Sequence, residues 1–186
     1  VAPVAPPLVA HANTIGLVDP PAAHLHDAYA GSNGGVAVGL VQDMNDATRW
    51  SAIDAPLTAD QLAAVQAGRF YVNVHTQANP GGELRGQVAP PPVEVLFSDL
   101  SGAQEVPANA STDSGLAAST VNRDTGTITL HLNATGADDA TAAHIHDGYA
   151  GQNGPVAVGL NSDPLDAGHW FVEEAQLDPD DLDAYL

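Results

Sequence analysis

Two histidine pairs in the sequence have the spacing of a metal chelate. His24 and His26 form the first pair, and His144 and His146 form the second, 120 positions later (144 − 24 = 120). Because successive side chains of a β-strand point to opposite faces, residues two apart share a face. A strand through either pair would therefore present two imidazoles on one side, where their nitrogens could bind a single metal ion.

Two further histidines precede these pairs on predicted strands. A hairpin that turns at residues 18–19 would place His11 opposite His26. The corresponding hairpin of the second copy would place His131 opposite His146. Each pair would then gain a third imidazole on the same patch of the sheet.

His75 lies on another predicted strand of the first copy, residues 70–76, and could supply a fourth ligand there. Three or four neutral imidazoles suit Cu(II) or Zn(II), and the order of intrinsic affinities favours copper. The candidate metal ligands are His11, His24, His26, His75, His131, His144 and His146.

The same histidines could instead form hydrogen bonds within the sheet without binding a metal. Six of the eight histidines in the chain form three pairs separated by 120 positions, which favours the interpretation as ligands. His169 has no counterpart in the first copy, and we expect it to be structural or simply exposed.

Two acidic loops, one in each copy, offer oxygen ligands of the kind that Ca²⁺ prefers. They contain Asp43 with Asp46 and Asp163 with Asp166. No full calcium-loop pattern surrounds these residues, and a solvated acidic loop explains them as well. Calcium is therefore a weak alternative to copper or zinc.

The chain is strongly acidic, with a formal net charge of −19, four arginines and no lysine. Phosphate binding needs clustered cations, so a nucleic-acid partner is excluded. The charge also repels anionic membranes, and no apolar run approaches the ~20 residues that cross a bilayer. The sequence has no cysteine, so any metal must bind to histidines and carboxylates.

An acidic surface without lysine also suits a high-salt habitat. Salt screens the repulsion between exposed like charges, so a halophilic protein of this charge should gain stability as salt is added. Urea unfolding at increasing NaCl concentrations measures this effect. A midpoint that does not rise would contradict the halophilic hypothesis.

The two histidine pairs belong to a longer internal repeat. Residues 22–40 and 142–160 have nearly the same sequence, which predicts two related units. We place unit 1 at residues 1–89 and unit 2 at residues 93–186. The linker at 90–92 consists of three prolines, which cannot join a central sheet.

Each unit lacks strands that the other contains. Unit 1 has no equivalent of the N-terminal strands at residues 93–122, and unit 2 has no equivalent of the C-terminal hairpin at residues 70–88. Neighbouring chains, or further parts of a longer protein, could supply them. Because unpaired edges invite strand addition, we expect homotypic assembly with other copies.

Short alternating segments between turn signals predict an all-β protein with one short helix in each unit. Thr58 and Gly68 mark the start and end of the helix in unit 1, and residues 177–182 repeat its beginning. The turn at residues 79–82 predicts a hairpin. The predicted strands are residues 8–15, 22–26, 36–41, 70–76, 83–88, 93–100, 115–122 and 127–132.

The repeated blocks resemble the CHRD domain, a module named from chordin. The resemblance rests on AAHLHDAYAGSNGGVAVGL, its copy AAHIHDGYAGQNGPVAVGL and the later FYVNVHTQANPGGELRGQV. It covers most of the chain and implies an extracellular protein, secreted or at the cell surface. It also implies tandem immunoglobulin-like Greek-key units, each a β-sandwich or barrel.

A weaker similarity links the histidine strands to the copper/zinc superoxide dismutases. The strand with His24 and His26, and the VNVHT strand with His75, resemble the copper-ligand strands of that family. The similarity implies these three histidines as copper ligands and His11 as a candidate fourth. Nothing matches the zinc-binding loop of that family, and its disulfide cysteines are absent, so the similarity implies a copper-only site.

Superoxide dismutation would also need a cation that attracts the anionic substrate. Arg85 is the candidate for this catalytic role, as an anion guide. A surface strand arginine that pairs with Glu83 or another acid is an equally good interpretation. The net charge of −19 opposes the approach of superoxide unless salt screens it.

The sequence therefore supports two functions. The first is an extracellular copper-binding protein, with superoxide dismutase-like chemistry as its candidate activity. The second is a structural subunit of an extracellular matrix or filament, assembled by strand complementation between repeats.

Overall fold

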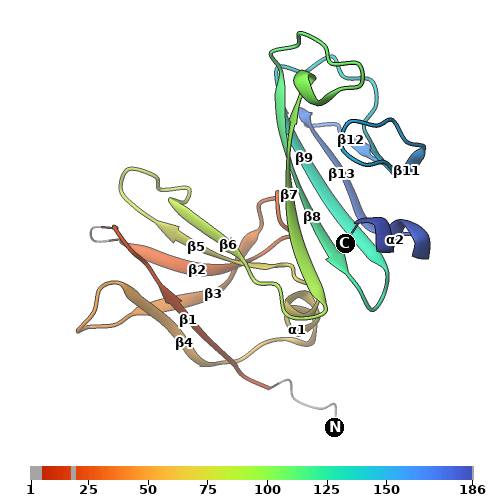
Figure 1. Cartoon of the computed structure of the whole chain (residues 1–186). Helices are drawn as coiled ribbons and strands as arrows, with labels where there is room; N and C mark the ends of the chain where they lie inside the picture. Colours follow the sequence, from red (N-terminus) through yellow and green to blue (C-terminus); the bar gives the residue numbers. More distant parts are fainter. Residues whose placement is uncertain (1–5, 18–19, 186) are drawn as a thin grey trace. The chain divides into compact units, whose positions relative to one another are not determined.

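The computed structural model describes residues 6–17 and 20–185 of the chain. Its contacts divide the chain into two compact units, Val1–Pro90 and Pro91–Leu186, which are described separately below. Each unit consists of antiparallel strands and one short α-helix (Figure 1). The turn predicted at residues 18–19 lies outside the described residues.

Unit 1 contains six strands and a helix that follows the fourth strand. These elements are β1 (Leu8–Asn13), β2 (Ala22–Asp27), β3 (Gly35–Gln42), β4 (Arg49–Ala55), α1 (Ala59–Gln66), β5 (Phe70–His75) and β6 (Leu84–Gln87). The strands form one sheet in the order β1-β4-β3-β2-β5-β6. β2, β3 and β4 form a meander, and β4, the last of them, pairs with β1. This arrangement of four strands is a Greek key.

One face of the sheet of unit 1 packs into an apolar core. Ala23 and Leu25 of β2 are buried there together with Trp50 of β4 and Phe70 and Val74 of β5. These residues occupy alternate positions of β2 and β5, as expected for strands with one core face. The other face of β2 and β5 is therefore left for polar side chains.

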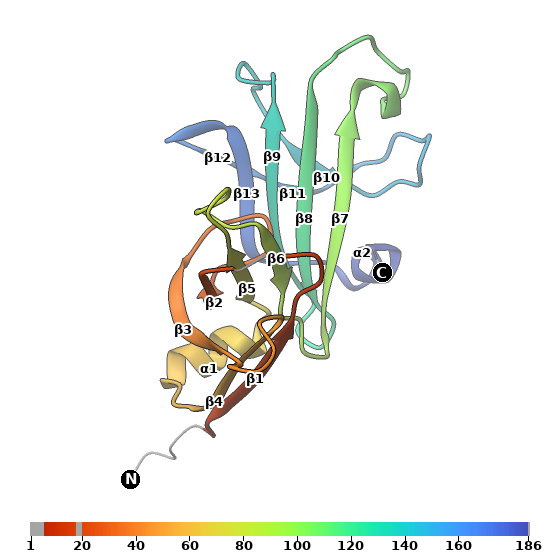
Figure 2. The same cartoon turned by 90° about the vertical axis from the view of Figure 1, so that its left-hand side faces the viewer.

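Unit 2 contains seven strands, a short 3₁₀ helix and an α-helix. These elements are β7 (Val93–Ser101), η1 (Gly102–Gln104), β8 (Ser114–Asn122), β9 (Thr127–Thr135), β10 (His144–His146), β11 (Val156–Gly159), β12 (Asn161–Asp163), β13 (Asp166–Gln176) and α2 (Pro179–Tyr185). Five strands form a sheet in the order β12-β13-β9-β8-β7, and β10 pairs with β11. The long strands β7, β8 and β9 lie side by side in Figure 2.

The core of unit 2 lies on the long sheet and beneath α2. Val121 and Ile128 are fully buried and pack with Leu177, which precedes the helix. Trp170 of β13 forms a second cluster with Leu132 and other apolar residues of the sheet. The predicted all-β fold, with Greek-key units and one short helix in each, is confirmed.

The helix of unit 1 begins where the sequence predicts it. Thr58 is the N-cap residue, and its hydroxyl accepts a hydrogen bond from the Gln61 backbone N–H at 3.1 Å. The Gln61 side chain accepts in return from the Thr58 N–H at 2.9 Å. This capping box satisfies two backbone donors that the helix itself leaves unpaired.

The repeat offset of 120 positions relates the elements of the two units. It matches β9 with β1, β10 with β2, β13 with β4 and α2 with α1, while β11 and β12 together match β3. β5 and β6 have no counterpart in the part of unit 2 that the structure describes. β7 and β8 likewise have none among the described residues of unit 1.

The predicted hairpin between the first two strands is wrong. β1 pairs with β4, which places His11 opposite Ser51. β3 and β4 therefore lie between β1 and β2, and His11 is not opposite His26. The prediction failed because a Greek key separates strands that are consecutive in the sequence.

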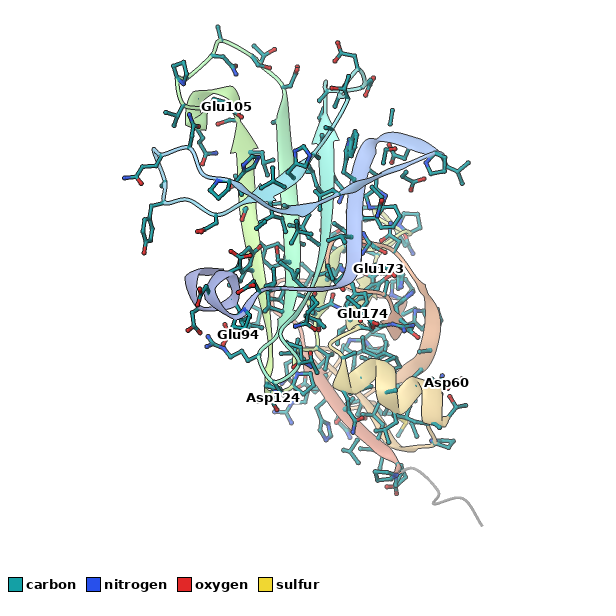
Figure 3. The ribbon with its side chains drawn as sticks, turned by 90° about the vertical axis from the view of Figure 1, so that its right-hand side faces the viewer. Asp60, Glu94, Glu105, Asp124, Glu173 and Glu174 are labelled. Carbon is teal, nitrogen blue, oxygen red and sulfur yellow. The ribbon has the colours of Figure 1, made fainter. Side chains whose placement is uncertain are left out.

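Acidic side chains lie on the outside of both units. Figure 3 shows Asp60 on α1, Glu94 on β7 and Asp124 in the turn between β8 and β9. Three of the four arginines form ion pairs with acids, namely Arg49 with Asp46, Arg69 with Asp27 and Arg123 with Glu94. In the described residues, no helix is long and apolar enough to cross a membrane.

Candidate metal centre

The candidate centre of unit 1 lies on β2, which is paired on both of its edges. Its neighbours in the sheet are β3 on one edge and β5 on the other. Ala23 and Leu25 point into the core, so His24 and His26 share the opposite face. The register with β5 places His75 opposite Ala22, the first residue of β2, so His75 lies near His24.

Three imidazoles meet on this face. The ring centroids are 5.7 Å apart for His24 and His26, 5.0 Å for His24 and His75, and 6.0 Å for His26 and His75. One nitrogen from each ring lies within 4.8 Å of the other two. Within the described part of the chain, this is the one group of three side chains found that could hold a metal ion.

Backbone carbonyls fix the tautomers of two of the three rings. His26 Nδ1 is 2.9 Å from the carbonyl oxygen of Gly34, and His75 Nδ1 is 3.0 Å from that of Pro80. A carbonyl oxygen only accepts hydrogen bonds, so each Nδ1 carries the proton and donates it. The lone pair of each Nε2 is then available for a metal, as in metal sites where the second nitrogen of a ligating imidazole is held by a hydrogen bond.

The Nε2 atom of His26 is buried and has no hydrogen-bond partner among the residues that the structure describes. An unpaired buried polar atom costs free energy, and most such atoms in folded proteins are paired. A metal ion at the three-nitrogen cluster would satisfy this atom, so the residues present fit a bound metal.

His24 completes the cluster through its Nδ1 atom, which lies 3.1 Å from His75 Nε2. Because the His75 proton is on Nδ1, His24 Nδ1 donates this hydrogen bond when no metal is bound. Desolvation by burial lowers the pKa of His24, and the nearby His75 and His26 lower it further. These effects favour the neutral imidazole, which is the form that binds metals.

Tyr71 of β5 supports the buried imidazole. Its ring stacks on His26 with 5.0 Å between centroids and an interplanar angle of 14°. Its hydroxyl accepts a hydrogen bond from the Gly34 N–H at 3.2 Å. Tyr71 therefore fixes both His26 and the glycine whose carbonyl orients it.

Arg85 of β6 ties the loop after β2 to the hairpin. Its guanidinium donates to the Ser32 carbonyl at 2.7 Å and to the Tyr29 carbonyl at 3.1 Å, and it lies 3.5 Å from the centroid of the Tyr71 ring. Burial lowers the pKa of Arg85, while Tyr71 acts in the opposite direction. The interpretation of Arg85 as a partner of Glu83 is wrong, because its donors face the loop.

An ion pair joins the end of β2 to the start of β5. Arg69 donates to both carboxylate oxygens of Asp27, at 3.0 and 3.1 Å, a two-point contact that fixes orientation as well as distance. The Ala28 N–H also donates to the Arg69 carbonyl at 2.7 Å. These contacts hold the two histidine strands in register at the end away from His75.

Unit 2 contains a two-histidine version of this arrangement. His144 and His146 of β10 have ring centroids 5.8 Å apart, and both are exposed. Among the described residues of unit 2, no third ligand joins them.

The prediction that His131 lies opposite His146 is wrong. His131 of β9 lies opposite Phe171 of β13 and Ala118 of β8. Its Nδ1 is 3.0 Å from His169 Nε2. His169 was expected to be structural or exposed. Its Nδ1 forms a hydrogen bond with Asp163 Oδ2 at 2.9 Å.

The acidic loops considered for calcium use their carboxylates to cap turns. Asp43 accepts from the Asn45 N–H at 2.8 Å, and Asp46 accepts from the backbone N–H of Thr48 at 3.0 Å. No acidic group of three ligands was found in the described residues. Calcium therefore gains no support from these loops.

Sequence reasoning missed the residues that orient the imidazoles. Tyr71 lies in the predicted hairpin and Arg69 directly precedes it, but neither residue gives a pattern that identifies its partner. No role was predicted for Gly34. Its repetition as Gly154 was the available signal that a close contact, and not only a turn, requires glycine there.

Gly34 should be irreplaceable where its neighbour Gly35 is not. A Cβ atom at Gly34 would lie 1.8 Å from the Asp27 carbonyl oxygen, whereas one at Gly35 would meet nothing within 4 Å. We expect Gly34→Ala to destabilise unit 1 by about 1–3 kcal/mol and to break the His26 hydrogen bond. Gly35→Ala should change stability by less than about 0.5 kcal/mol.

Urea unfolding followed by Trp50 fluorescence in a Trp170→Phe background measures the stability, because Trp50 then reports on unit 1 alone. NMR of the His26 ring measures the loss of its Nδ1 hydrogen bond. Equal effects of the two alanine substitutions would contradict the assigned contact.

Comparison with protein-family models identifies the CHRD domain twice in the chain, over residues 7–88 and 96–186. The two matches together cover most of the sequence. No curated protein and no solved structure matches the chain. The chain belongs to the CHRD domain family.

Proposed function

We propose that this protein binds copper through His24 Nδ1, His26 Nε2 and His75 Nε2. The observation that carries the proposal is the meeting of three imidazole nitrogens within 4.8 Å. Two of these nitrogens have their lone pairs directed into the cluster by the tautomer that a carbonyl imposes. Such pre-organisation reduces the cost of ordering the ligands when the ion binds.

Copper is favoured by the donor set. All three ligands are imidazoles, which suit copper, zinc, iron and nickel, and intrinsic affinity among divalent ions peaks at Cu²⁺. Zinc is the alternative. The net charge of −19 raises the local concentration of any cation near the surface.

We propose superoxide dismutase-like chemistry as the activity of the loaded centre. Copper supplies reversible one-electron transfer when bound. The three imidazoles would hold the ion, and Tyr71 and the carbonyls of Gly34 and Pro80 would keep them oriented. Arg85 is the proposed anion guide, since its cation stacks on Tyr71 beside the cluster.

CHRD domains are typically extracellular, and we propose that this chain is secreted or displayed at the cell surface. The metal would then be taken up outside the cell. A site built from histidines alone suits that setting, because it contains no thiolate to be oxidised.

Removing any one of the three histidines should abolish tight copper binding. Loss of a residue that only orients a ligand weakens metal affinity by about 10–100-fold. Because His24→Ala and His75→Ala each remove a ligand itself, we expect each to weaken copper affinity by more than this. Isothermal titration with copper, and the nitrogen couplings seen by electron paramagnetic resonance, measure the effect. Circular dichroism verifies that each variant is folded.

His11→Ala is the matched control, because His11 lies on β1, and β4 and β3 separate β1 from β2. It should leave copper binding unchanged. Unaltered affinity in both His24→Ala and His75→Ala would contradict the site. Copper binding without superoxide dismutation by the loaded protein would contradict the activity alone.

A second proposed function is that of a structural subunit assembled by strand complementation. The observation in its favour is the difference between two matched strands. β9 is paired on both edges, by β13 and β8, whereas its counterpart β1 pairs only with β4 in the described part of unit 1. The free edge of β1 offers backbone donors and acceptors to a strand of another molecule.

If β1 drives assembly, the protein should form larger species as its concentration rises. Size-exclusion chromatography with light scattering, and electron microscopy of concentrated samples, measure this. Val9→Pro removes one backbone donor from the exposed edge strand and should shift the distribution toward monomer. A monomer at every concentration would count against the structural function and leave the metal proposal untouched.

A further inference from the structure

Asn73 lies in the row of side chains that faces the candidate centre. Residues two apart on a strand share a face, so Tyr71, Asn73 and His75 of β5 lie on one side of the sheet. The register places Asn73 opposite His24 on β2 and opposite Arg85 on β6. Asn73 is therefore the cross-strand neighbour of a proposed ligand.

The side chain of Asn73 is bonded to the turn between β5 and β6. Asn73 is 8% exposed, so its amide needs a hydrogen-bond partner inside the protein. That partner is the carbonyl oxygen of Gly81, 3.2 Å from Nδ2. A carbonyl oxygen only accepts, so the Asn73 amide nitrogen donates this bond. A side chain of β5 thus holds the turn that follows the strand.

The same turn carries the carbonyl that orients His75. Gly81 directly follows Pro80, whose carbonyl oxygen lies 3.0 Å from His75 Nδ1. Asn73 and His75 therefore donate to two consecutive carbonyls of the turn. A shift of the Gly81 carbonyl would also move the Pro80 carbonyl, because the two planar peptide units meet at the Gly81 Cα atom.

The turn also packs directly against the Asn73 amide. Gly82 has a backbone φ of +137°, which glycine adopts far more readily than other residues. A Cβ atom at Gly82 would lie 2.6 Å from Asn73 Nδ2 and closer still to Oδ1. Glycine at this position therefore allows the amide to reach the Gly81 carbonyl.

Glu83 holds the same turn through other residues. Its carboxylate accepts from the Thr76 hydroxyl at 3.0 Å and from the Asn79 side-chain amide. The Asn79 N–H also donates to the Thr76 hydroxyl oxygen at 3.0 Å. Because these contacts remain when Asn73 is replaced, we expect the hairpin to stay folded in Asn73 variants while the Pro80 carbonyl shifts.

We propose that Asn73 is a positioning residue of the candidate centre. Its amide holds the turn so that the Pro80 carbonyl keeps the His75 proton on Nδ1, which leaves the Nε2 lone pair for the cluster. The expected effect of Asn73 on copper affinity rests on the proposed metal function. The effect on the His75 tautomer is present without metal.

The His75 tautomer is a readout that a merely structural role of Asn73 would not change. In the metal-free protein His24 Nδ1 donates to His75 Nε2, 3.1 Å away. When the Pro80 carbonyl moves, His75 can also carry its proton on Nε2 and donate it to His24 Nδ1. Both tautomers are then populated. Heteronuclear NMR of the imidazole nitrogens distinguishes them, because protonated and unprotonated ring nitrogens differ in chemical shift.

The test compares variants of the full chain, stripped of metal with EDTA and dialysed. Asn73→Ala and Asn73→Asp both remove the donor to Gly81, and both should give a mixture of His75 tautomers where the native chain gives one. Copper titration should then show an affinity about 10–100-fold lower, as for other residues that orient ligands. The carboxylate of Asn73→Asp would by itself attract a cation, so a lower affinity there points to the lost donor.

Two controls separate positioning from charge and from stability. Gln77→Glu adds the same charge at an exposed position of the same turn. It should leave one His75 tautomer and change copper affinity by less than about threefold. Val74→Ala truncates a core side chain next to Asn73 and lowers stability, but it should leave the His75 tautomer unchanged.

Gly82→Ala tests the same contact from the turn. Its methyl group would displace the Asn73 amide, so it should produce the same mixture of tautomers. Gly86→Ala is the matched control, because its Cβ atom would meet nothing within 4 Å, and it should produce no mixture. Combining Gly82→Ala with Asn73→Ala should lower copper affinity little more than either change alone, as expected for residues in direct contact.

Two results would overturn the positioning role. The first is a single His75 tautomer in Asn73→Ala and Gly82→Ala, each verified as folded by circular dichroism; Gly82→Ala decides if the Asn73 variants do not fold. The second is a mixture of tautomers with unchanged copper affinity, since the orientation of His75 would then have no effect on the centre. A mixture in these variants of a chain that binds no copper even in its native form would contradict the proposed metal function and support the hold of Asn73 on His75.

Discussion

The antiparallel pairing of β2 with β5 is the constraint on which the candidate centre depends. Two ligands lie on β2 and the third on β5, and the register places His75 opposite Ala22. A slip of one residue would turn every side chain of a strand to the opposite face. It would send the imidazoles into the core and the apolar residues outward. The core of unit 1 therefore enforces the geometry of the centre, because both depend on one register.

The orientation of the imidazoles comes from the backbone and not from other charged side chains. Gly34 and Pro80 provide the carbonyl oxygens that hold His26 and His75, and both belong to loops next to the histidine strands. The chain has only four cations, and Arg69 and Arg85 fasten those same strands and loops. Neutral carbonyls can orient a histidine in so acidic a protein without adding further negative charge at the ligands. They also leave the ligands uncharged, as metal binding requires.

Local patterns predicted some parts of this structure well. The hairpin β5–β6 followed from its alternation and its turn, and α1 followed from the cap at Thr58. The prediction that His24 and His26 share one face needed only the two-residue repeat of a β-strand. These features depend on residues close together in the sequence, where spacing carries the information.

The order of strands in the sheet could not be predicted in the same way. His11 was predicted opposite His26, and His131 opposite His146, on the assumption that consecutive strands pair. The Greek key instead separates β1 from β2 and β9 from β10. The sequence of β4, RWSAIDA, alternates too weakly between apolar and polar residues to identify this strand as the partner of β1. The contact of Tyr71 with His26 likewise depends on which strands meet and in which register. An alternating pattern states which face a side chain occupies, but not which neighbour it meets.

The internal repeat separates what a segment determines by itself from what its surroundings add. The strand pair and its loop have the same register and the same histidine–carbonyl contact in both units, although β5 flanks the pair only in unit 1. The orientation of the second histidine is therefore a property of the local sequence, with the close approach at Gly34 and Gly154 as its steric condition. The burial of the site does not follow from the local sequence, because Tyr29 is 7% exposed and Tyr149 is 80% exposed within nearly the same sequence. The third nitrogen is not local either, since it comes from β5. In unit 1, one stretch of chain thus provides two of the three imidazoles of the candidate centre, and β5, far along the sequence, provides the third.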